Sequence, residues 1–325
     1  MSLSVFVTRH LTPIAEEKLN TFCTPEYWPE DTPPPYETLL EKTRHVAGLI
    51  CLLTDTIDAR LINQAENLKV ISQVAVGVDN IDLQAADSRG IPVGHTPDLL
   101  TDATADLTFA LILAAARRLS EAIDYARSGR WQTWGLTTLL GESVHGATLG
   151  IIGMGRIGQA LARRAQGFEM RILFTDISGH PEREQEFGAT RVTLETLLKE
   201  SDIISLHVPL TPSTAGMIGA DQLKSMKPHA VLVNAARGPV IDTDALVLAL
   251  ETGQIGYAAL DVTDPEPLPP THPLYKLPNA LILPHIGSAT RPTRDQMSLL
   301  AVDNLIAGLQ GKPLPKAVAQ STGRR

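Results

Sequence analysis

Three side chains in the second half of the sequence could together perform proton-coupled chemistry on a small acid. Arg237, in Asn-Ala-Ala-Arg-Gly, has a planar guanidinium that can hold a carboxylate through two hydrogen bonds. His285, in Leu-Pro-His-Ile-Gly, can give and take a proton near neutral pH. Glu266, flanked by two prolines, could orient that imidazole and stabilise its protonated form. Considered alone, Glu266 is more readily a solvated loop acid, so only the combination indicates chemistry.

A second chemical feature is the glycine spacing within Thr148–Gly158. Gly153, Gly155 and Gly158 follow a short apolar run and precede a helical pattern. In such a turn the first glycine permits the bend, the second admits a pyrophosphate to the backbone, and the third lets the helix pack on the strand. Asp176 follows Gly158 by eighteen residues, where an acid can accept hydrogen bonds from ribose hydroxyls. The segment predicts a dinucleotide site; the alternative is a glycine-rich connector without a ligand.

These groups need parallel strands that deliver them to one edge of a sheet. Apolar runs predict strands at 148–152, 170–175, 202–207, 230–234, 256–260 and 280–283. In an open parallel sheet, ligands bind beyond the carboxyl ends of the strands. Polar residues stand at five of these ends: Asp176, His207, Asn234 with Arg237, Asp261 and His285. A single polar residue after a strand is usually a turn residue, but five such ends beside the glycine turn favour a binding site.

The first hundred residues show the same alternation. Strands are expected at 3–7, 48–53, 69–74 and 92–93, helices at 13–19, 36–43, 59–64 and 83–88, and a proline-rich loop at 24–36. Strands that alternate with helices indicate an α/β fold with parallel strands.

A long helix is expected from Thr101 or Asp102 to about Ser128, and its apolar content predicts cover on more than one side. It would be a domain crossover, a subunit interface or a central core helix. Trp131 and Trp134 follow it in a loop, where they would fill a pocket or a partner surface because exposing them is costly. Further helices are expected from 194, 244 and 293, the first two capped by Thr193 and Thr243.

Composition excludes several classes of protein. With 325 residues, 43% of them hydrophobic, the chain can form two domains. The net charge of −8 and the lack of a dense Lys/Arg run argue against a nucleic-acid partner. Cys23 and Cys51 show no metal-ligand spacing, so no metal site is expected, and they indicate a reducing compartment. Neither a signal peptide nor an apolar run of about 18 residues is present, so we expect a soluble cytoplasmic protein without a membrane partner.

The sequence resembles the D-isomer-specific 2-hydroxyacid dehydrogenases over nearly its whole length, and among them the glyoxylate/hydroxypyruvate reductases. The stretches that carry the resemblance are 74–82, 96–106, 150–158, 234–238, 256–269 and 283–290. The resemblance implies two doubly wound parallel-sheet domains. A Rossmann-type dinucleotide-binding domain, 99–287, would be inserted into a flavodoxin-like substrate domain made of 1–98 and 288–325.

The resemblance also implies roles for single residues. Arg237 would bind the substrate carboxylate and keto oxygen, and His285 would be the acid/base paired with Glu266. Further substrate contacts are implied for Leu53, for the backbone N–H groups of Val76 and Gly77, and for Trp134, which in similar reductases reaches the partner's active site within a homodimer. The implied cofactor contacts are Thr104, Gly153, Gly155, Arg156, Ile157, Gly158, Asp176, His207, Val208, Pro209, Thr214, Ala235, Ala236, Asp261, His285 and Gly287, with Asp261 on the nicotinamide amide.

One departure from the family bears on the cofactor. The mammalian-type hydroxypyruvate reductases end the second nucleotide strand in Gly-Arg, which suits a 2′-phosphate, whereas Asp176-Ile177 stands here. A carboxylate repels that phosphate, and Arg183 is the only nearby cation in the sequence. We therefore expect NAD(H) to be preferred to NADP(H).

The function expected is the NADH-dependent reduction of a small 2-oxo acid, glyoxylate and/or hydroxypyruvate, to the 2-hydroxy acid. The enzymatic alternative is another D-2-hydroxyacid dehydrogenase, of the lactate or phosphoglycerate type, although no Arg/Lys cluster for a substrate phosphate is evident. A third alternative is an NAD(H)-sensing binding protein similar to the corepressors of this fold. Those corepressors keep the Arg, Glu and His but carry long tails, which are not expected here.

Overall fold

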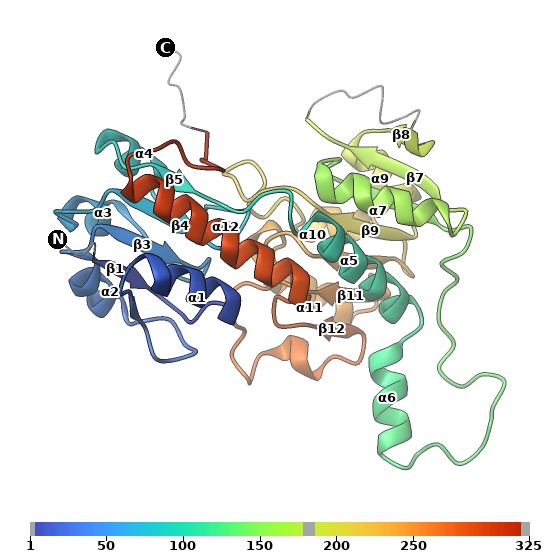
Figure 1. The fold of residues 1–325 in the computed structure, drawn as a ribbon. Helices are drawn as coiled ribbons and strands as arrows, with labels where there is room; N and C mark the ends of the chain where they lie inside the picture. The colour runs from blue at the N-terminus through green and yellow to red at the C-terminus, as the bar shows by residue number, and fades with distance from the viewer. Residues whose placement is uncertain (1–3, 178–185, 320–325) are drawn as a thin grey trace. The chain divides into compact units, whose positions relative to one another are not determined.

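The computed structural model describes residues 4–177 and 186–319 (Figure 1). The chain folds into two compact units: unit 1 comprises Met1–Leu100 and Ala289–Arg325, and unit 2 comprises Thr101–Ser288. The boundaries expected from the sequence, after residues 98 and 287, lie within two residues of these. Among the described residues, no helix combines the length and the apolar character needed to cross a membrane.

Unit 1 contains a five-stranded parallel sheet in the order β2-β1-β3-β4-β5. Its strands are β1 (Val5–Val7), β2 (Glu26–Tyr27), β3 (Gly48–Cys51), β4 (Val70–Gln73) and β5 (Val93–Gly94). This order is that of the flavodoxin-like fold, in which ligands bind at the carboxyl edge where the strand order reverses. The flavodoxin-like expectation is confirmed.

Two layers of helices cover the sheet of unit 1, as the ribbon in Figure 1 shows. The helices are α1 (Pro13–Phe22), α2 (Tyr36–Thr43), α3 (Ala59–Gln64), α4 (Leu83–Ser88) and α12 (Arg291–Leu309). Along β1, Phe6 packs with α2, α3 and α4, whereas Val5 and Val7 pack with α1 and α12. This alternation follows from the two-residue period of a strand. The segment after residue 288 therefore returns to complete the first unit.

Unit 2 contains a seven-stranded parallel sheet in the order β12-β11-β10-β9-β6-β7-β8. Its strands are β6 (Thr148–Ile152), β7 (Arg171–Thr175), β8 (Thr190–Arg191), β9 (Ile203–Leu206), β10 (Val231–Asn234), β11 (Tyr257–Leu260) and β12 (Ala280–Ile282). β6 lies between β7 and β9, which is where the order reverses, so the Rossmann-type arrangement is confirmed. The glycine turn that follows β6 thus opens at the crevice where such sheets bind ligands.

Helices flank both faces of the sheet of unit 2. They are α5 (Thr101–Ala116), α7 (Arg156–Gln166), α9 (Leu194–Glu200), α10 (Ala220–Ser225) and α11 (Thr243–Glu251), with short 3-10 turns η1 (Gly238–Val240) and η2 (Pro273–Lys276). A further helix, α6 (Leu119–Arg127), has no buried residue and extends away from the sheet beyond α5 (Figure 1). Ile151 packs with α5 and α7, and the next residue, Ile152, packs with α9, α10 and α11. α5 lies between α7 and the strands β10 to β12, so it is covered on more than one side, as its apolar content predicts.

Several local expectations are wrong. The long helix breaks at Arg118, whose φ of 52° lies in the left-handed region, so α5 and α6 are separate helices. The proline-rich loop contains the short strand β2, and α10 and β8 were not predicted. The helix caps differ as well: Thr193 does cap α9, but α11 is capped by Asp242 rather than Thr243, and α12 begins at Arg291 rather than residue 293.

Candidate active site

The glycine turn has the close contacts that its spacing predicts. Gly153 has a φ of +97°, and a Cβ there would lie 2.7 Å from the carbonyl oxygen of His207. A Cβ on Gly158 would lie 2.3 Å from the carbonyl oxygen of Gly153, so the start of α7 needs a glycine to pack on the turn. Gly155 differs, because a Cβ there would meet nothing within 4 Å. The middle glycine therefore faces open space rather than a neighbouring side chain.

Asp176 lies beside this turn, at the carboxyl end of β7. One of its carboxylate oxygens accepts the backbone N–H of Met154 at 2.8 Å, and Arg191 donates to its backbone carbonyl at 2.9 Å. Arg183 lies outside the described residues. The expectation that Arg183 is the only nearby cation is wrong, because β8 pairs with β7 and brings Arg191 to Asp176.

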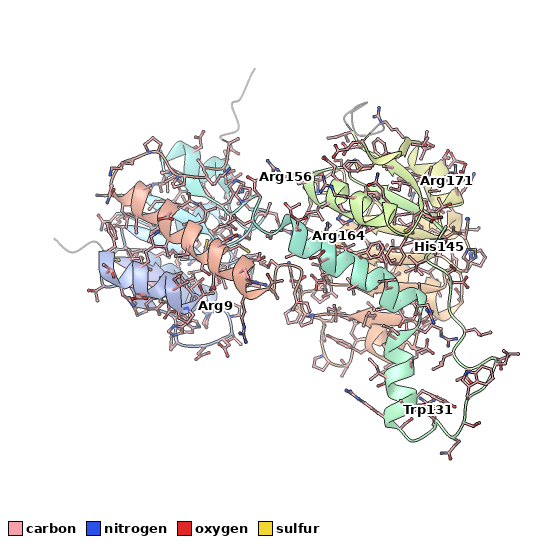
Figure 2. All side chains as sticks on the ribbon, turned by 45° about the vertical axis from the view of Figure 1, so that its right-hand side comes forward. Arg9, Trp131, His145, Arg156, Arg164 and Arg171 are labelled. Atoms are coloured by element: carbon pink, nitrogen blue, oxygen red, sulfur yellow. The ribbon has the colours of Figure 1, made fainter. Side chains whose placement is uncertain are left out.

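The residues around the turn fit a dinucleotide. Arg156 and Ile157 are the first two residues of α7. Figure 2 labels Arg156. The N–H groups of a helix N-terminus attract a pyrophosphate. Burial lowers the pKa of His207 to about 4, so its imidazole is neutral at pH 7. Its Nε2 lies 2.9 Å from the hydroxyl of Ser205, while its buried Nδ1 has no hydrogen-bond partner among the residues described. The carbonyl oxygen of His207 lies against Gly153, so this histidine lines the glycine turn.

Two further turns at the same edge contain the other implied cofactor residues. Val208 and Pro209 follow β9, and the hydroxyl of Thr214 donates to the carbonyl of Pro209 at 2.6 Å, which closes that turn. Ala235 and Ala236 follow β10.

The turn that carries Arg237 is fixed by a buried amide. Asn234, the last residue of β10, donates from Nδ2 to the carbonyl of Arg237 at 2.8 Å and accepts the N–H of Ala236 at 3.0 Å. The next residue, Gly238, packs against the loop before Glu266: a Cβ on Gly238 would lie 1.9 Å from the carbonyl oxygen of Thr263. The Arg237 turn and the Glu266 loop are therefore held against each other.

Glu266 and His285 meet across nineteen residues of sequence, with Oε1 and Nδ1 separated by 2.6 Å. The other oxygen, Oε2, accepts the N–H of Thr263 at 3.3 Å. Burial raises the pKa of Glu266, but the hydrogen bond and charge of His285, the N–H of Thr263 and the charge of Arg237 lower it by more. The net pKa of Glu266 lies below its ordinary value, so this carboxylate is ionised at neutral pH.

Asp261 fixes the backbone that presents His285. Its side chain is buried, and its two carboxylate oxygens accept the N–H groups of Ile286 and Gly287, each at 2.7 Å. Burial raises the pKa of Asp261 above its ordinary value. His285 itself has a φ of 54° and donates its own N–H to the carbonyl of Asp261 at 2.9 Å. Thr104 of α5 lies next to this turn, its methyl carbon 3.3 Å from where a Cβ on Gly287 would be.

The substrate residues implied in the first hundred positions belong to unit 1. Leu53 lies in the turn after β3, and Val76 and Gly77 lie in the turn after β4. Both turns are at the carboxyl edge of the unit 1 sheet, because β3 and β4 are parallel neighbours.

The two loop tryptophans are exposed, with 66% of Trp131 and 80% of Trp134 accessible to solvent. Figure 2 shows Trp131 in the loop beyond α6. The alternative that they fill a pocket of this chain is therefore wrong.

Sequence reasoning named Asn234 as a polar residue at a strand end but did not give it the supporting role that the structure shows. It did not single out Thr263, whose N–H supports Glu266. A buried amide needs partners, which is the signal that could have indicated the role of Asn234.

Comparisons with known proteins agree with this geometry. The D-isomer-specific 2-hydroxyacid dehydrogenase NAD-binding domain matches residues 109–287. A glyoxylate reductase from Thermococcus litoralis is 49% identical over 322 residues, which is 98% of this chain and 97% of that protein.

Solved structures are similar over the full length. The TT0316 protein from Thermus thermophilus has a TM-score of 0.91 and 48% identity, covering 97% of this chain and 100% of that one. An NADPH-dependent glyoxylate/hydroxypyruvate reductase from Sinorhizobium meliloti, solved with NADP and malonate, has a TM-score of 0.87 and 33% identity, covering 100% of this chain and 99% of that one.

The glycine turn, the polar residues at the strand ends and these similarities lead to one assignment. The chain belongs to the D-isomer-specific 2-hydroxyacid dehydrogenases, enzymes that use a nicotinamide cofactor, and its second unit contains the NAD-binding domain of that family.

Proposed function

We propose that this enzyme reduces glyoxylate and/or hydroxypyruvate to the 2-hydroxy acid, with NADH as the reductant. The observation that carries the proposal is the contact of 2.6 Å between Glu266 and His285, in the unit that also contains Arg237 and the open glycine turn. The substrate class is supported by the relatives, which include a glyoxylate reductase 49% identical over 98% of the chain.

Each side chain has a defined task in this proposal. Arg237 binds the substrate carboxylate and stabilises the negative charge that develops on the keto oxygen. When bound, NADH supplies the hydride that the carbonyl carbon receives. Since Nδ1 of His285 faces Glu266, Nε2 is the atom that gives a proton to the keto oxygen, and the ionised Glu266 stabilises the imidazolium that gives it. The N–H groups of Val76 and Gly77 hold the carboxylate, with Leu53 nearby.

The test is turnover of glyoxylate and hydroxypyruvate, followed by the loss of NADH absorbance, for the wild type and His285→Ala. We expect kcat to fall at least about a hundredfold in the variant, since a positioned general acid contributes about 10²–10⁴-fold. The Kd for NADH should stay within about twofold. His145→Ala is a matched control, because His145 is an exposed histidine of the same unit that pairs with Glu169.

Three outcomes separate the alternatives. Near-normal turnover by His285→Ala would exclude this histidine as the acid. A wild type that binds NADH tightly but turns over no 2-oxo acid would indicate a sensor instead. Turnover confined to larger 2-oxo acids would indicate another D-2-hydroxyacid dehydrogenase.

NADH rather than NADPH is proposed because of Asp176. Its carboxylate lies beside the glycine turn, accepting from Met154, where it would face the ribose hydroxyls and repel a 2′-phosphate. Arg191, on the backbone of Asp176, is the cation that a phosphate could use instead. The similar enzyme from Sinorhizobium meliloti is NADPH-dependent, so the relatives do not support one cofactor over the other.

A homodimer is proposed from the exposed apolar surface of unit 2. Its residues lie on α6 and in the loop that follows: Leu119, Ile123, Trp131, Trp134, Leu136 and Leu140, each between 46% and 80% accessible. An apolar patch of this kind marks a protein interface more often than bare surface. In the dimer, Trp134 would reach the partner's active site. A cytoplasmic location is also proposed, in keeping with the two free cysteines, Cys23 and Cys51.

A further inference from the structure

The turn after β4 has an unusual distribution of hydrogen bonds. All four carbonyl oxygens of 75–78 accept a hydrogen bond from the protein: Ala75 from the N–H of Thr96 (2.8 Å), Val76 from Nδ1 of His95 (2.9 Å), Gly77 from Nε2 of Gln73 (3.3 Å) and Val78 from the N–H of Ile81 (3.0 Å). The N–H groups of Val76 and Gly77, in contrast, have no acceptor within 4–177 and 186–319. A turn with its carbonyls occupied and successive N–H groups available is suited to an anion.

The bond from His95 acts on the peptide group that matters most. A carbonyl oxygen can only accept, so Nδ1 of His95 must carry the hydrogen in this contact. The carbonyl of Val76 and the N–H of Gly77 belong to one planar peptide group, so fixing the oxygen also fixes the direction of the N–H. Donation to the oxygen further polarises the group and makes its N–H a stronger donor.

His95 is itself held on both sides by its backbone. Its N–H donates to the carbonyl of Lys316 at 3.0 Å, and its carbonyl accepts Nδ2 of Asn304 at 3.1 Å. Asn304 is fully buried on α12. It packs closely against Gly94, the residue before His95, where a Cβ would lie 2.7 Å from the Asn304 side chain. The imidazole therefore extends from a fixed point of the backbone toward the turn.

Gln73 holds the neighbouring carbonyl with an amide whose groups are all used. Its Nε2 donates to Gly77 and, at 2.7 Å, to Oδ1 of Asn80, while its Oε1 accepts the thiol of Cys51 at 3.0 Å. Gln73 is fully buried, so water cannot replace a bond lost there.

Asn80 extends this network to the other substrate turn. Its Nδ2 donates to the carbonyls of Leu52 and Asp55, at 3.0 and 2.9 Å. These two residues flank Leu53, so one pair of amides joins both turns at the carboxyl edge of unit 1.

We propose that His95 is a positioning residue for the substrate carboxylate: by holding the carbonyl of Val76 it fixes the peptide group that presents the N–H of Gly77 to an anion. Gln73 holds the next carbonyl, that of Gly77, and so keeps the far side of the same turn in place. Asn80 fixes the orientation of the Gln73 amide. This inference rests on the proposed function, in which the N–H groups of Val76 and Gly77 bind the carboxylate.

The test centres on His95, because its contact with the turn is at the surface and its loss should not prevent folding. His95→Leu removes the donor, and His95→Asn keeps a donor on the atom that corresponds to Nδ1. We expect the KM for glyoxylate to rise about tenfold in His95→Leu and to return within about threefold of the wild type in His95→Asn, the range of one hydrogen bond to a charged group. The Kd for NADH should not change in either.

Two other variants complete the design. Gln73→Met should also raise KM and leave the Kd for NADH unchanged, with a fall in Tm because buried groups lose partners. His45→Leu is the matched control, since His45 is an exposed histidine of unit 1 that pairs with Glu66. It should keep the wild-type KM.

The outcomes are distinct. A wild type without turnover of any 2-oxo acid overturns the proposed function and this inference with it. An active wild type with an unchanged KM in His95→Leu overturns the inference alone. A lower Tm in His95→Leu without a change in KM, or a raised KM that His95→Asn does not restore, indicates a structural role only and overturns it too.

Discussion

At the scale of single residues, the proposed chemistry depends on the charge of Glu266. This carboxylate has a pKa below its ordinary value, because the hydrogen bond and charge of His285, the N–H of Thr263 and the charge of Arg237 outweigh its burial. The ionised Glu266 therefore faces Nδ1 of His285 with a negative charge, which stabilises the ring while it carries the proton that it gives.

Glu266→Gln tests this role through the pH dependence of reduction. The amide keeps the hydrogen-bonding shape but carries no charge at any pH. Because the pKa of Glu266 is lowered, the wild type keeps this charge until the pH falls below the ordinary range of a carboxyl group, and kcat/KM should fall there as Glu266 is protonated. In Glu266→Gln this acid limb should disappear, and kcat at neutral pH should be about tenfold lower. Steady-state rates with glyoxylate across the pH range measure both. An acid limb that persists in Glu266→Gln, or an unchanged kcat at neutral pH, contradicts the role given to Glu266.

Asp176 is the residue whose charge should decide the cofactor. The wild type should have a larger kcat/KM for NADH than for NADPH, and Asp176→Asn should raise the NADPH/NADH ratio at least about tenfold, because removing a charge beside a phosphate changes its binding by more than about 1.4 kcal/mol. Asn keeps an oxygen that can accept from Met154, so the glycine turn should survive.

Asp221→Asn is the control for Asp176→Asn, because Asp221 is an exposed acid on α10 to which no cofactor contact is assigned. It should leave the NADPH/NADH ratio unchanged. A wild type that prefers NADPH would refute the assignment of Asp176 and direct attention to Arg191.

At the scale of elements, the site depends on close approaches between turns that only glycine permits. Gly238 is the sharpest case, because a Cβ there would lie 1.9 Å from the carbonyl oxygen of Thr263. This approach holds the end of β10, with Arg237, against the loop that carries Glu266. A side chain at position 238 would push these two backbones apart and would move Arg237 away from Glu266.

Gly238→Ala should therefore damage stability and activity together. We expect a loss of about 1–3 kcal/mol in the free energy of unfolding, because the added methyl group meets backbone that cannot move away, and a fall in kcat. Urea unfolding and glyoxylate turnover measure these.

Gly167→Ala is the matched control, because its Cβ would lie 3.5 Å from the nearest atom, an ordinary contact. Its free energy of unfolding should stay within about 1 kcal/mol of the wild type. If both variants behave alike, the approach at Gly238 does not hold the turns together.

At the scale of the whole molecule, the exposed apolar residues of α6 and the following loop raise the question of assembly. The net charge of −8 opposes nonspecific association of the chain. Two tryptophans exposed at 66% and 80% nevertheless indicate a surface that binds a specific partner. A second copy of the chain is the proposed partner.

Ile123→Glu tests the dimer. Ile123 is 49% exposed on α6, and a buried carboxylate at an interface is costly, so sedimentation should show a dimer for the wild type and a monomer for the variant. Leu248→Glu, on α11 with Leu248 58% exposed, is the control and should remain dimeric. A monomeric wild type, or a dimeric Ile123→Glu, would exclude this face.

Trp134→Ala should raise KM while leaving the dimer intact.

The sequence by itself determined the fold class and the identity of the chemical groups. A strand, a glycine turn and a helix are defined by short-range sterics and by periods of two and 3.6 residues, so Thr148–Gly158 and the alternation in both halves could be recognised locally. The family motifs supplied Arg237, Glu266 and His285 by type. The sequence analysis missed β2, β8 and α10, whose segments contain no apolar run.

Only the tertiary structure decided which groups meet. The contact of Glu266 with His285 spans nineteen residues, the bond from Asn304 to the carbonyl of His95 spans 209, and the break at Arg118 overrides a continuous helical pattern. Such pairings depend on how the helices and sheets pack, because many contacts between distant segments are needed to bring the two partners together. The local sequence thus shows which kinds of side chain the site contains, whereas only the folded unit shows where they lie relative to one another.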